Sequence, residues 1–146
     1  MCLQKLINIW KTPKGAEVTM NDISLALVSQ LGGVQNSIYL DGKYKTKSFD
    51  EIAQIIYENK GDKEIYVSDY YDCDDFAIAL FGHFKSKPET SHIPFGLCFV
   101  KTSASPHAIN IFYADDGKLY MVEPQTDEIW LVGSSHSDYD PYFVMI

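Results

Sequence analysis

The sequence predicts a single α+β domain in which helices come first and an antiparallel sheet follows. The chain has 146 residues, of which 46% are hydrophobic and 22% charged, as in a globular domain that can bury a core. Aromatic residues make up 14%, which favours a sheet-containing fold over a helical bundle. No linker, repeat or low-complexity tract interrupts the chain, so residues 1–146 are predicted to form one domain.

Charge and hydropathy exclude several classes of partner. The formal net charge of −8 argues against nucleic acid, because such binding depends on Lys and Arg neutralising phosphates. No window approaches the roughly 18 apolar residues of a membrane span. The first ten residues are partly apolar but lack a following cleavage signal, so they are expected to belong to the fold. Three cysteines without paired spacing indicate no disulfide framework and a cytoplasmic, reducing compartment.

The first half begins with a predicted helix and a predicted hairpin. Apolar residues recur with helical spacing over residues 21–31, and Gly32 ends that run. Two short runs at 37–40 and 43–47 flank Asp41-Gly42, a dipeptide typical of a two-residue hairpin turn.

A second helix is predicted from a capping box. The hydroxyl of Ser48 can accept a hydrogen bond from the amide of Glu51, whose carboxylate can reach back. The helix then runs to Asn59, and Gly61 breaks it. A short strand is predicted at 64–67.

The second half contains one more helix and then a run of strands. The helix is predicted over about Cys73 to Lys85. The segments with strand patterning are 95–101, 107–114, 118–123, 128–132 and an edge strand at 142–146.

Cys73 lies at the first position of that helix. Asp72 is a suitable N-cap, and Asp75 fits the first turn. A helix N-terminus lowers the pKa of a thiol, as a nucleophile requires. The carboxylates of Asp72, Asp74 and Asp75 oppose this effect, so the alternative of a structural cysteine stays open. Cys98, within an apolar strand, is predicted to be structural.

The hairpin around residues 115–117 predicts which side chains share a face. If the loop has three residues and Gly117 is left-handed, residue 111 pairs with 121. His107 and Glu123 then lie on one face at roughly 7–8 Å between backbones. A two-residue turn would place them on opposite faces.

These residues resemble a known pattern. The segment 73–77 (Cys-Asp-Asp-Phe-Ala), His107-Ala108 and Glu123-Pro124 are similar to the transglutaminase-like core of the papain-like cysteine hydrolase superfamily, over about residues 70–124. Glutamate in place of the usual aspartate resembles the C-terminal cysteine protease domain of the proteins related to Marasmius oreades agglutinin. In papain-like proteases, a Gln often lies a few residues before the cysteine. Residues 64–72 of this chain contain no Gln.

The resemblance implies a papain-like fold whose nucleophile helix packs on the antiparallel sheet. It also implies a proteolytic site, activation by calcium and a homodimer. The lectin half of those proteins has no counterpart here, so the resemblance implies no glycan binding. Small domains of this kind also look like phage and bacterial proteins.

The main functional hypothesis is a cysteine peptidase or amidase acting on a peptide or protein substrate. Cys73 would attack the acyl carbon, His107 would shuttle the proton and Glu123 would orient the imidazole. One alternative is acyl transfer to an amine by the same triad. Another is a non-enzymatic binding or assembly module that keeps the fold.

Calcium is a subsidiary hypothesis, and no other cofactor is expected. Asp72, Asp74 and Asp75 supply hard oxygen ligands, as do Asp115 and Asp116. Helix capping and turn formation account for both groups without a metal.

Overall fold

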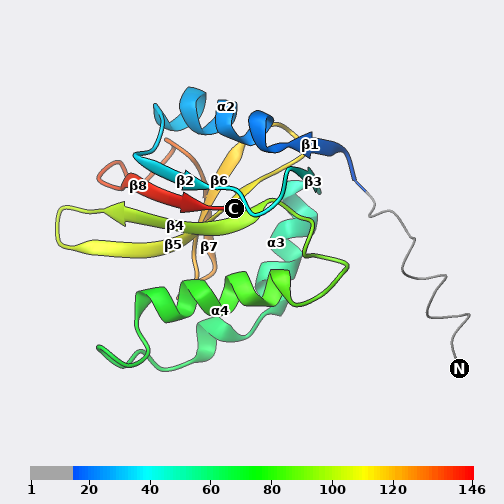
Figure 1. Ribbon diagram of the computed structural model, residues 1–146. Coiled ribbons are helices and arrows are strands. Elements are labelled where there is room, and N and C mark those ends of the chain that lie inside the picture. Colours follow the sequence, from blue (N-terminus) through cyan, green and yellow to red (C-terminus); the bar gives the residue numbers. More distant parts are fainter. Residues whose placement is uncertain (1–14) are drawn as a thin grey trace, which may run out of the picture.

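The computed structural model describes residues 15–146 (Figure 1). The expectation that the first ten residues belong to the fold lies outside the described residues. The helices are α2 (Met20–Leu31), α3 (Phe49–Glu58) and α4 (Cys73–Lys85), with a 3₁₀ turn η1 (Gly61–Lys63). The strands are β1 (Glu17–Thr19), β2 (Asn36–Ile38), β3 (Lys43–Lys45), β4 (Phe95–Lys101), β5 (Pro106–Tyr113), β6 (Leu119–Glu123), β7 (Glu128–Leu131) and β8 (Asp140–Met145).

A six-stranded sheet forms the centre, with helices on both faces (Figure 1). Its strand order is β2-β8-β4-β5-β6-β7, and β1 pairs with β3 in a separate two-stranded sheet. Successive side chains of a strand point to opposite faces, so each central strand serves two cores. Ile109 and Ile111 of β5 lie in the core that includes Ile23 of α2. Phe112 lies in the core that includes residues of α3 and α4.

Aromatic rings fill the core beneath α3 and α4. The rings of Phe84 and Phe95 stack with centroids 3.8 Å apart. Phe112 continues the stack toward Tyr120, at 5.2 Å. Much of the high aromatic content of the sequence is therefore used to pack the sheet against these helices.

The predicted fold class, a papain-like arrangement of helices on an antiparallel sheet, is wrong, because the observed sheet is not antiparallel throughout. The sheet is mixed, because β2 runs parallel to β8. β8 lies between β2 and β4 and is not an edge strand. The predicted hairpin at Asp41-Gly42 does not form, since β2 pairs with β8 and β3 with β1. Backbone bonds from Leu40 N to Ile146 O (2.8 Å) and from Ile146 N to Ile38 O (2.9 Å) use the groups that a hairpin would need.

Most other predicted elements are confirmed within a residue or two. The capping box of α3 is present, with Ser48 N donating to Glu51 Oε2 at 3.0 Å. Helix α2 begins one residue early, behind a capping box between Thr19 and Asp22. The strand predicted at 64–67 is wrong, since this segment has only an isolated bridge between Val67 and Tyr71. Among residues 15–146, no helix is long and apolar enough to span a membrane.

The turn between β6 and β7 contains a carboxylate that should make stability depend on pH. Burial, and then the charge of Asp62, raise the pKa of Asp127 from 3.8 to about 6. The folded state therefore holds this proton more tightly than the unfolded state, and the resulting stability is lost as pH rises from about 4 to 6. Asp127 also has a left-handed backbone (φ 58°), which Asn tolerates.

We therefore expect Asp127→Asn to stabilise the domain at pH 7 and to have little effect at pH 4. The expected gain is roughly 0.5–1 kcal/mol, because the side chain is largely solvent-screened. Urea denaturation at both pH values measures it, with Asp140→Asn on β8 as the control. An equal effect of Asp127→Asn at the two pH values would contradict this account.

Candidate functional site

The start of α4 follows the predicted capping pattern. The backbone N–H of Asp72 donates to Asp75 Oδ2 at 3.1 Å. Asp72 Oδ2 in turn accepts from the backbone N–H of Asp69 at 3.2 Å. These bonds fix the chain immediately before Cys73, the first residue of the helix. Asp75 is thus engaged in capping.

The thiol of Cys73 is half-buried, in surroundings that favour its protonated form. It packs against Ala77 of α4 and Ala108 of β5. Burial is the largest cause that raises the pKa of Cys73, and the charges of Asp72 and Asp74 raise it further. A backbone hydrogen bond from Ala108 opposes them only in part. The predicted opposition of the carboxylates to the helix N-terminus is therefore confirmed.

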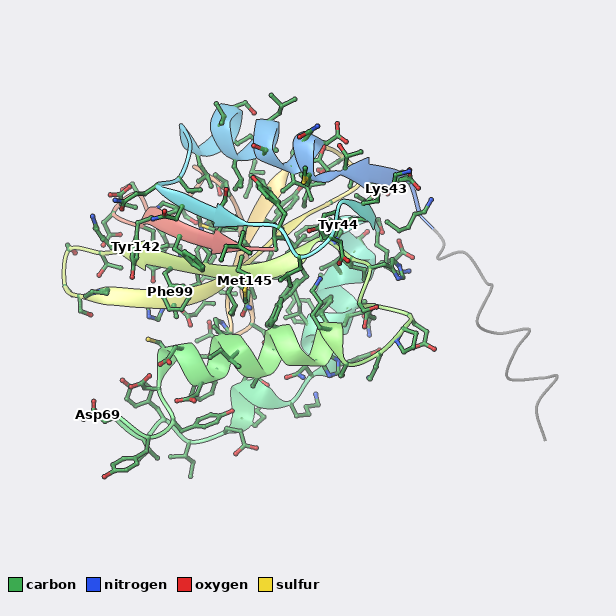
Figure 2. The ribbon with its side chains drawn as sticks, viewed as in Figure 1. Lys43, Tyr44, Asp69, Phe99, Tyr142 and Met145 are labelled. Carbon is green, nitrogen blue, oxygen red and sulfur yellow. The ribbon has the colours of Figure 1, made fainter. Side chains whose placement is uncertain are left out.

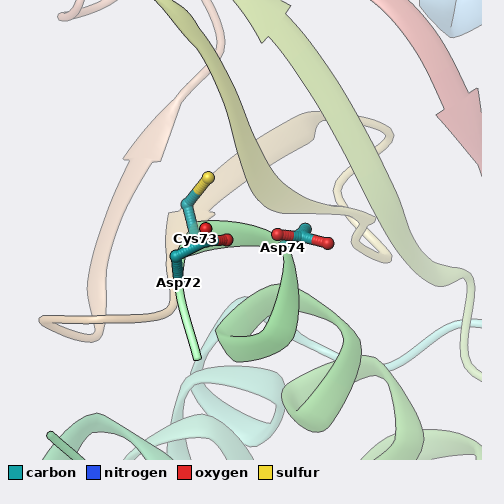
Figure 3. Close-up of side chains that lie close together, drawn as sticks. All are labelled: Asp72, Cys73 and Asp74. Carbon is teal, nitrogen blue, oxygen red and sulfur yellow. The ribbon is translucent and has the colours of Figure 1, made fainter. Parts of the chain in front are cut away.

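Asp72, Cys73 and Asp74 form a compact group of potential ligands (Figure 3). One ligand atom from each side chain lies within 4.8 Å of the others. A hydrogen bond between the two carboxyl groups raises the pKa of Asp74 and lowers that of Asp72. Of the three predicted cation ligands, Asp72 and Asp74 are brought together beside the thiol, whereas Asp75 is not in this group.

The predicted pair of His107 and Glu123 meets. His107 Nε2 and Glu123 Oε2 lie 2.6 Å apart in a hydrogen bond, and both side chains are partly buried. The pairing of Ile111 with Met121 and the left-handed Gly117 (φ 77°) match the predicted three-residue loop. The ring of Tyr139 lies 5.9 Å from that of His107. This part of the site follows directly from the strand register.

Among residues 15–146, the thiol of Cys73 makes no hydrogen bond to His107 or Glu123. The thiol packs with Ala108, on the face of β5 that α4 covers. His107, one residue earlier, shares the face of Ile109, which packs with α2 residues. Strand alternation alone therefore does not bring the sulfur and the imidazole together, and the convergence of Cys73 with this pair stays a prediction.

Two exposed tyrosines, Tyr66 and Tyr70, belong to the same region, and of these the sequence analysis missed Tyr66. Residues 65–71 form a tight hairpin, with Val67 N donating to Tyr71 O at 2.9 Å and Tyr71 N to Val67 O at 2.7 Å. Figure 2 shows its turn, marked by Asp69, projecting from the body. Tyr70 is 84% exposed and Tyr66 53% exposed.

Tyr66 feels the acidic groups at the start of α4. Desolvation, followed by the electrostatic effect of Asp72 and of its neighbours Cys73 and Asp69, raises the pKa of its hydroxyl. The sequence signal for this region is a cluster of tyrosines directly before the N-cap of a helix. Such a cluster more often indicates aromatic packing than a binding site.

Cys98 is structural, as predicted. It is 0% exposed, and burial raises its pKa to about 12. A thiol in this setting is inert at neutral pH.

Comparison with known proteins identifies the family. The family described as "Agglutinin C-terminal" matches residues 44–129, more than half of the chain. The chain belongs to this family. The resemblance to agglutinin-related proteins is thereby confirmed at the family level. A search of curated proteins found no match.

The Agglutinin C-terminal chain is also similar to two solved structures. One is a Polyporus squamosus lectin bound to the human-type influenza-binding epitope Neu5Aca2-6Galb1-4GlcNAc, with a TM-score of 0.74 and 24% identity over 89% of this chain and 49% of that chain. The other is described as a PSL1a-E64 complex, with a TM-score of 0.74 and 23% identity over 89% of this chain and 51% of that chain. The chain thus spans about half the length of each, and at this identity the likeness shows the fold alone.

These findings correct the hydrolase hypothesis. The family is that of an agglutinin domain, and the first of the two structures is a lectin. The expected papain-like fold class and the expected enzyme activity, as peptidase, amidase or acyl transferase, are therefore wrong. The half-buried, protonated thiol agrees with this correction. The homodimer stays a prediction.

Proposed function

We propose that this Agglutinin C-terminal domain is a non-enzymatic binding module with a carbohydrate ligand. The proposed site is the edge where the 65–71 hairpin meets the N-terminus of α4. The observation that supports it most strongly is that Tyr66 and Tyr70 are exposed in the hairpin that leads directly into Asp72 and the start of α4. The first of the two similar structures, of which this chain covers 49%, is a lectin bound to a glycan. For this reason we set aside the earlier expectation that the resemblance implies no glycan binding.

The chemistry of this edge suits a sugar. The exposed rings of Tyr66 and Tyr70 offer apolar faces against which the C–H face of a pyranose can pack. The carboxyl groups of Asp72 and Asp74 can accept hydrogen bonds from sugar hydroxyls. The hairpin is closed by its own backbone bonds, so little ordering is needed on binding.

Cys73 belongs to this edge, and His107 and Glu123 stay proposed as further ligand contacts on the neighbouring strands β5 and β6. A protonated thiol is a weak nucleophile. Among residues 15–146, Cys73 makes no hydrogen bond to His107 that would activate it. The bonded pair of His107 and Glu123 is partly exposed and offers polar atoms to a ligand. Binding without turnover is the function these properties favour.

The local charge should decide which sugars bind. Asp69, Asp72 and Asp74 lie around Tyr66, and the domain as a whole carries a net charge of −8. An anionic sugar would be repelled from this edge. We therefore expect neutral saccharides to bind better than sialylated ones.

Asp72 and Asp74 are also the proposed ligands for a divalent cation. Their oxygens suit calcium, and their atoms lie within 4.8 Å of each other and of the Cys73 sulfur. A bound cation would offset the negative charge and could coordinate sugar hydroxyls.

Titration calorimetry of the whole chain with matched neutral and sialylated oligosaccharides tests the proposal. Tyr66→Ala and Tyr70→Ala should each weaken binding of the neutral sugar by about 5- to 10-fold, as expected for loss of one aromatic contact. Tyr57→Ala is the matched control, because Tyr57 is 51% exposed on α3, outside the hairpin. The measurements are repeated with calcium and with a chelator.

Two outcomes would overturn the proposal. One is that no saccharide binds to the wild-type chain under any of these conditions. The other is turnover of a peptide or amide substrate that disappears in Cys73→Ala, since that would make the domain an enzyme.

A further inference from the structure

Asn110 of β5 is a buried polar residue in the layer between α4 and the sheet. Its side chain is 0% exposed, and among the described residues only Thr46 is another buried polar side chain. Burying an amide in an apolar core costs stability unless hydrogen bonds compensate. A residue of this kind therefore requires an account of its partners.

The amide of Asn110 connects three elements. Its Nδ2 donates to the backbone carbonyl of Ala77 in α4 at 2.9 Å. It also donates to the carbonyl of Gly96 in β4 at 3.1 Å. Its Oδ1 is buried and has no hydrogen-bond partner within residues 15–146. The side chain thus makes directional contacts without being fully satisfied, which stability alone does not favour.

The contact with Ala77 lies one turn from the proposed site. Ala77 follows Cys73 by four residues, so the two lie one above the other on the same face of α4. Ala77 packs on Ala108 of β5, with Cys73 beside it. The bond from Asn110 therefore fixes how far α4 can slide along β5, and with it the place of Cys73 beside Ala108.

We propose that Asn110 is a positioning residue for the site at the N-terminus of α4. Apolar packing alone between α4 and the sheet tolerates small shifts, whereas a bond to one carbonyl of the helix does not. Through Ala77, the amide holds Cys73 and its flanking carboxylates in register with the backbone of Ala108. The effect on a sugar ligand rests on the proposed function, but the effect on the thiol does not.

Asn110→Leu is the decisive variant, because leucine has a similar shape and no polar atoms. It removes both bonds and also the unsatisfied Oδ1, so the thermal midpoint should stay within about 3 °C of wild type. Cys73 packs beside Ala77 on Ala108, so a helix that shifts along β5 changes how far the sulfur is covered. The rate of Cys73 alkylation by iodoacetamide at pH 8 should therefore change by at least about threefold, although the thermal midpoint hardly moves.

Thr46→Val is the matched control. Thr46 is the other buried polar residue, and its Oγ1 donates to Ala16 O at 3.2 Å, in the two-stranded-sheet region. It should alter the midpoint without changing the rate of Cys73 alkylation. If Asn110→Leu does not fold, Asn110→Ala, which removes both bonds and introduces no polar atom, gives the same labelling measurement.

The outcomes separate this inference from the proposed function. A wild-type rate of Cys73 alkylation in a folded Asn110 variant would overturn the positioning role. Absence of sugar binding by the wild-type chain would instead overturn the proposed function. The alkylation rate of Cys73 would still test the positioning role of Asn110 in that case. If the wild type binds sugar, Asn110→Leu should weaken the affinity by about fivefold.

Discussion

Replacing Gly96 with alanine is expected to lower the free energy of unfolding by about 3 kcal/mol. A Cβ atom at this position would lie 2.1 Å from the carbonyl oxygen of Met145 and 2.8 Å from Cα of Ile146. Both contacts are with backbone, so no side-chain rotation can relieve them. β8 would have to move away from β4, and the bonds that Ile146 makes to Ile38 and Leu40 would be strained.

Urea denaturation measures this change, and Gly82→Ala is the matched control. Gly82 lies on the exposed side of α4, and an added Cβ would meet nothing within 4 Å. In a helix interior, alanine should stabilise by roughly 0.5–1 kcal/mol relative to glycine. The two substitutions should therefore act in opposite directions. Equal, small effects would show that β8 does not pack as closely on β4 as described.

Local signals in the sequence predicted the elements and one register well. The pairing of β5 with β6 depends on a short loop and on strand alternation, both of which are visible within residues 107–123. The parallel pairing of β2 with β8 joins residues 36–38 to 143–145. No local sequence pattern predicts a contact between segments so far apart in the chain. The turn signal at Asp41-Gly42 was misleading for the same reason, because distant partners took the strand bonds.

The candidate site was predictable to the same extent. His107 and Glu123 meet because they lie on adjacent strands of a predicted register. The position of Cys73 depends on how α4 docks on the sheet, which contacts such as that of Asn110 with Ala77 determine. The role of Tyr66 depends on the path of a hairpin with no regular strand pattern. Sequence reasoning therefore located the chemical groups but not how the helix that carries the thiol docks beside them.

Cys73 should be alkylated by iodoacetamide at least about 100-fold faster than Cys98 at pH 8. Cys98 is 0% exposed with a pKa of about 12, whereas Cys73 is partly exposed. A Cys2→Ser variant simplifies the measurement, which follows each thiol by mass spectrometry of its peptide. Cys73 should nevertheless react more slowly than a free cysteine, because burial and the charges of Asp72 and Asp74 raise its pKa.

Two further variants separate a ligand contact from an activated nucleophile. Asp74→Asn removes one negative charge beside the sulfur, so the thiolate fraction and the alkylation rate should rise several-fold. His107→Ala should change the rate by less than about twofold, because no hydrogen bond joins its imidazole to the thiol within residues 15–146. A tenfold or larger loss of rate in His107→Ala would mean that the imidazole does activate Cys73. In that case, the two side chains must meet at the end of β5, and the non-enzymatic assignment would have to be abandoned.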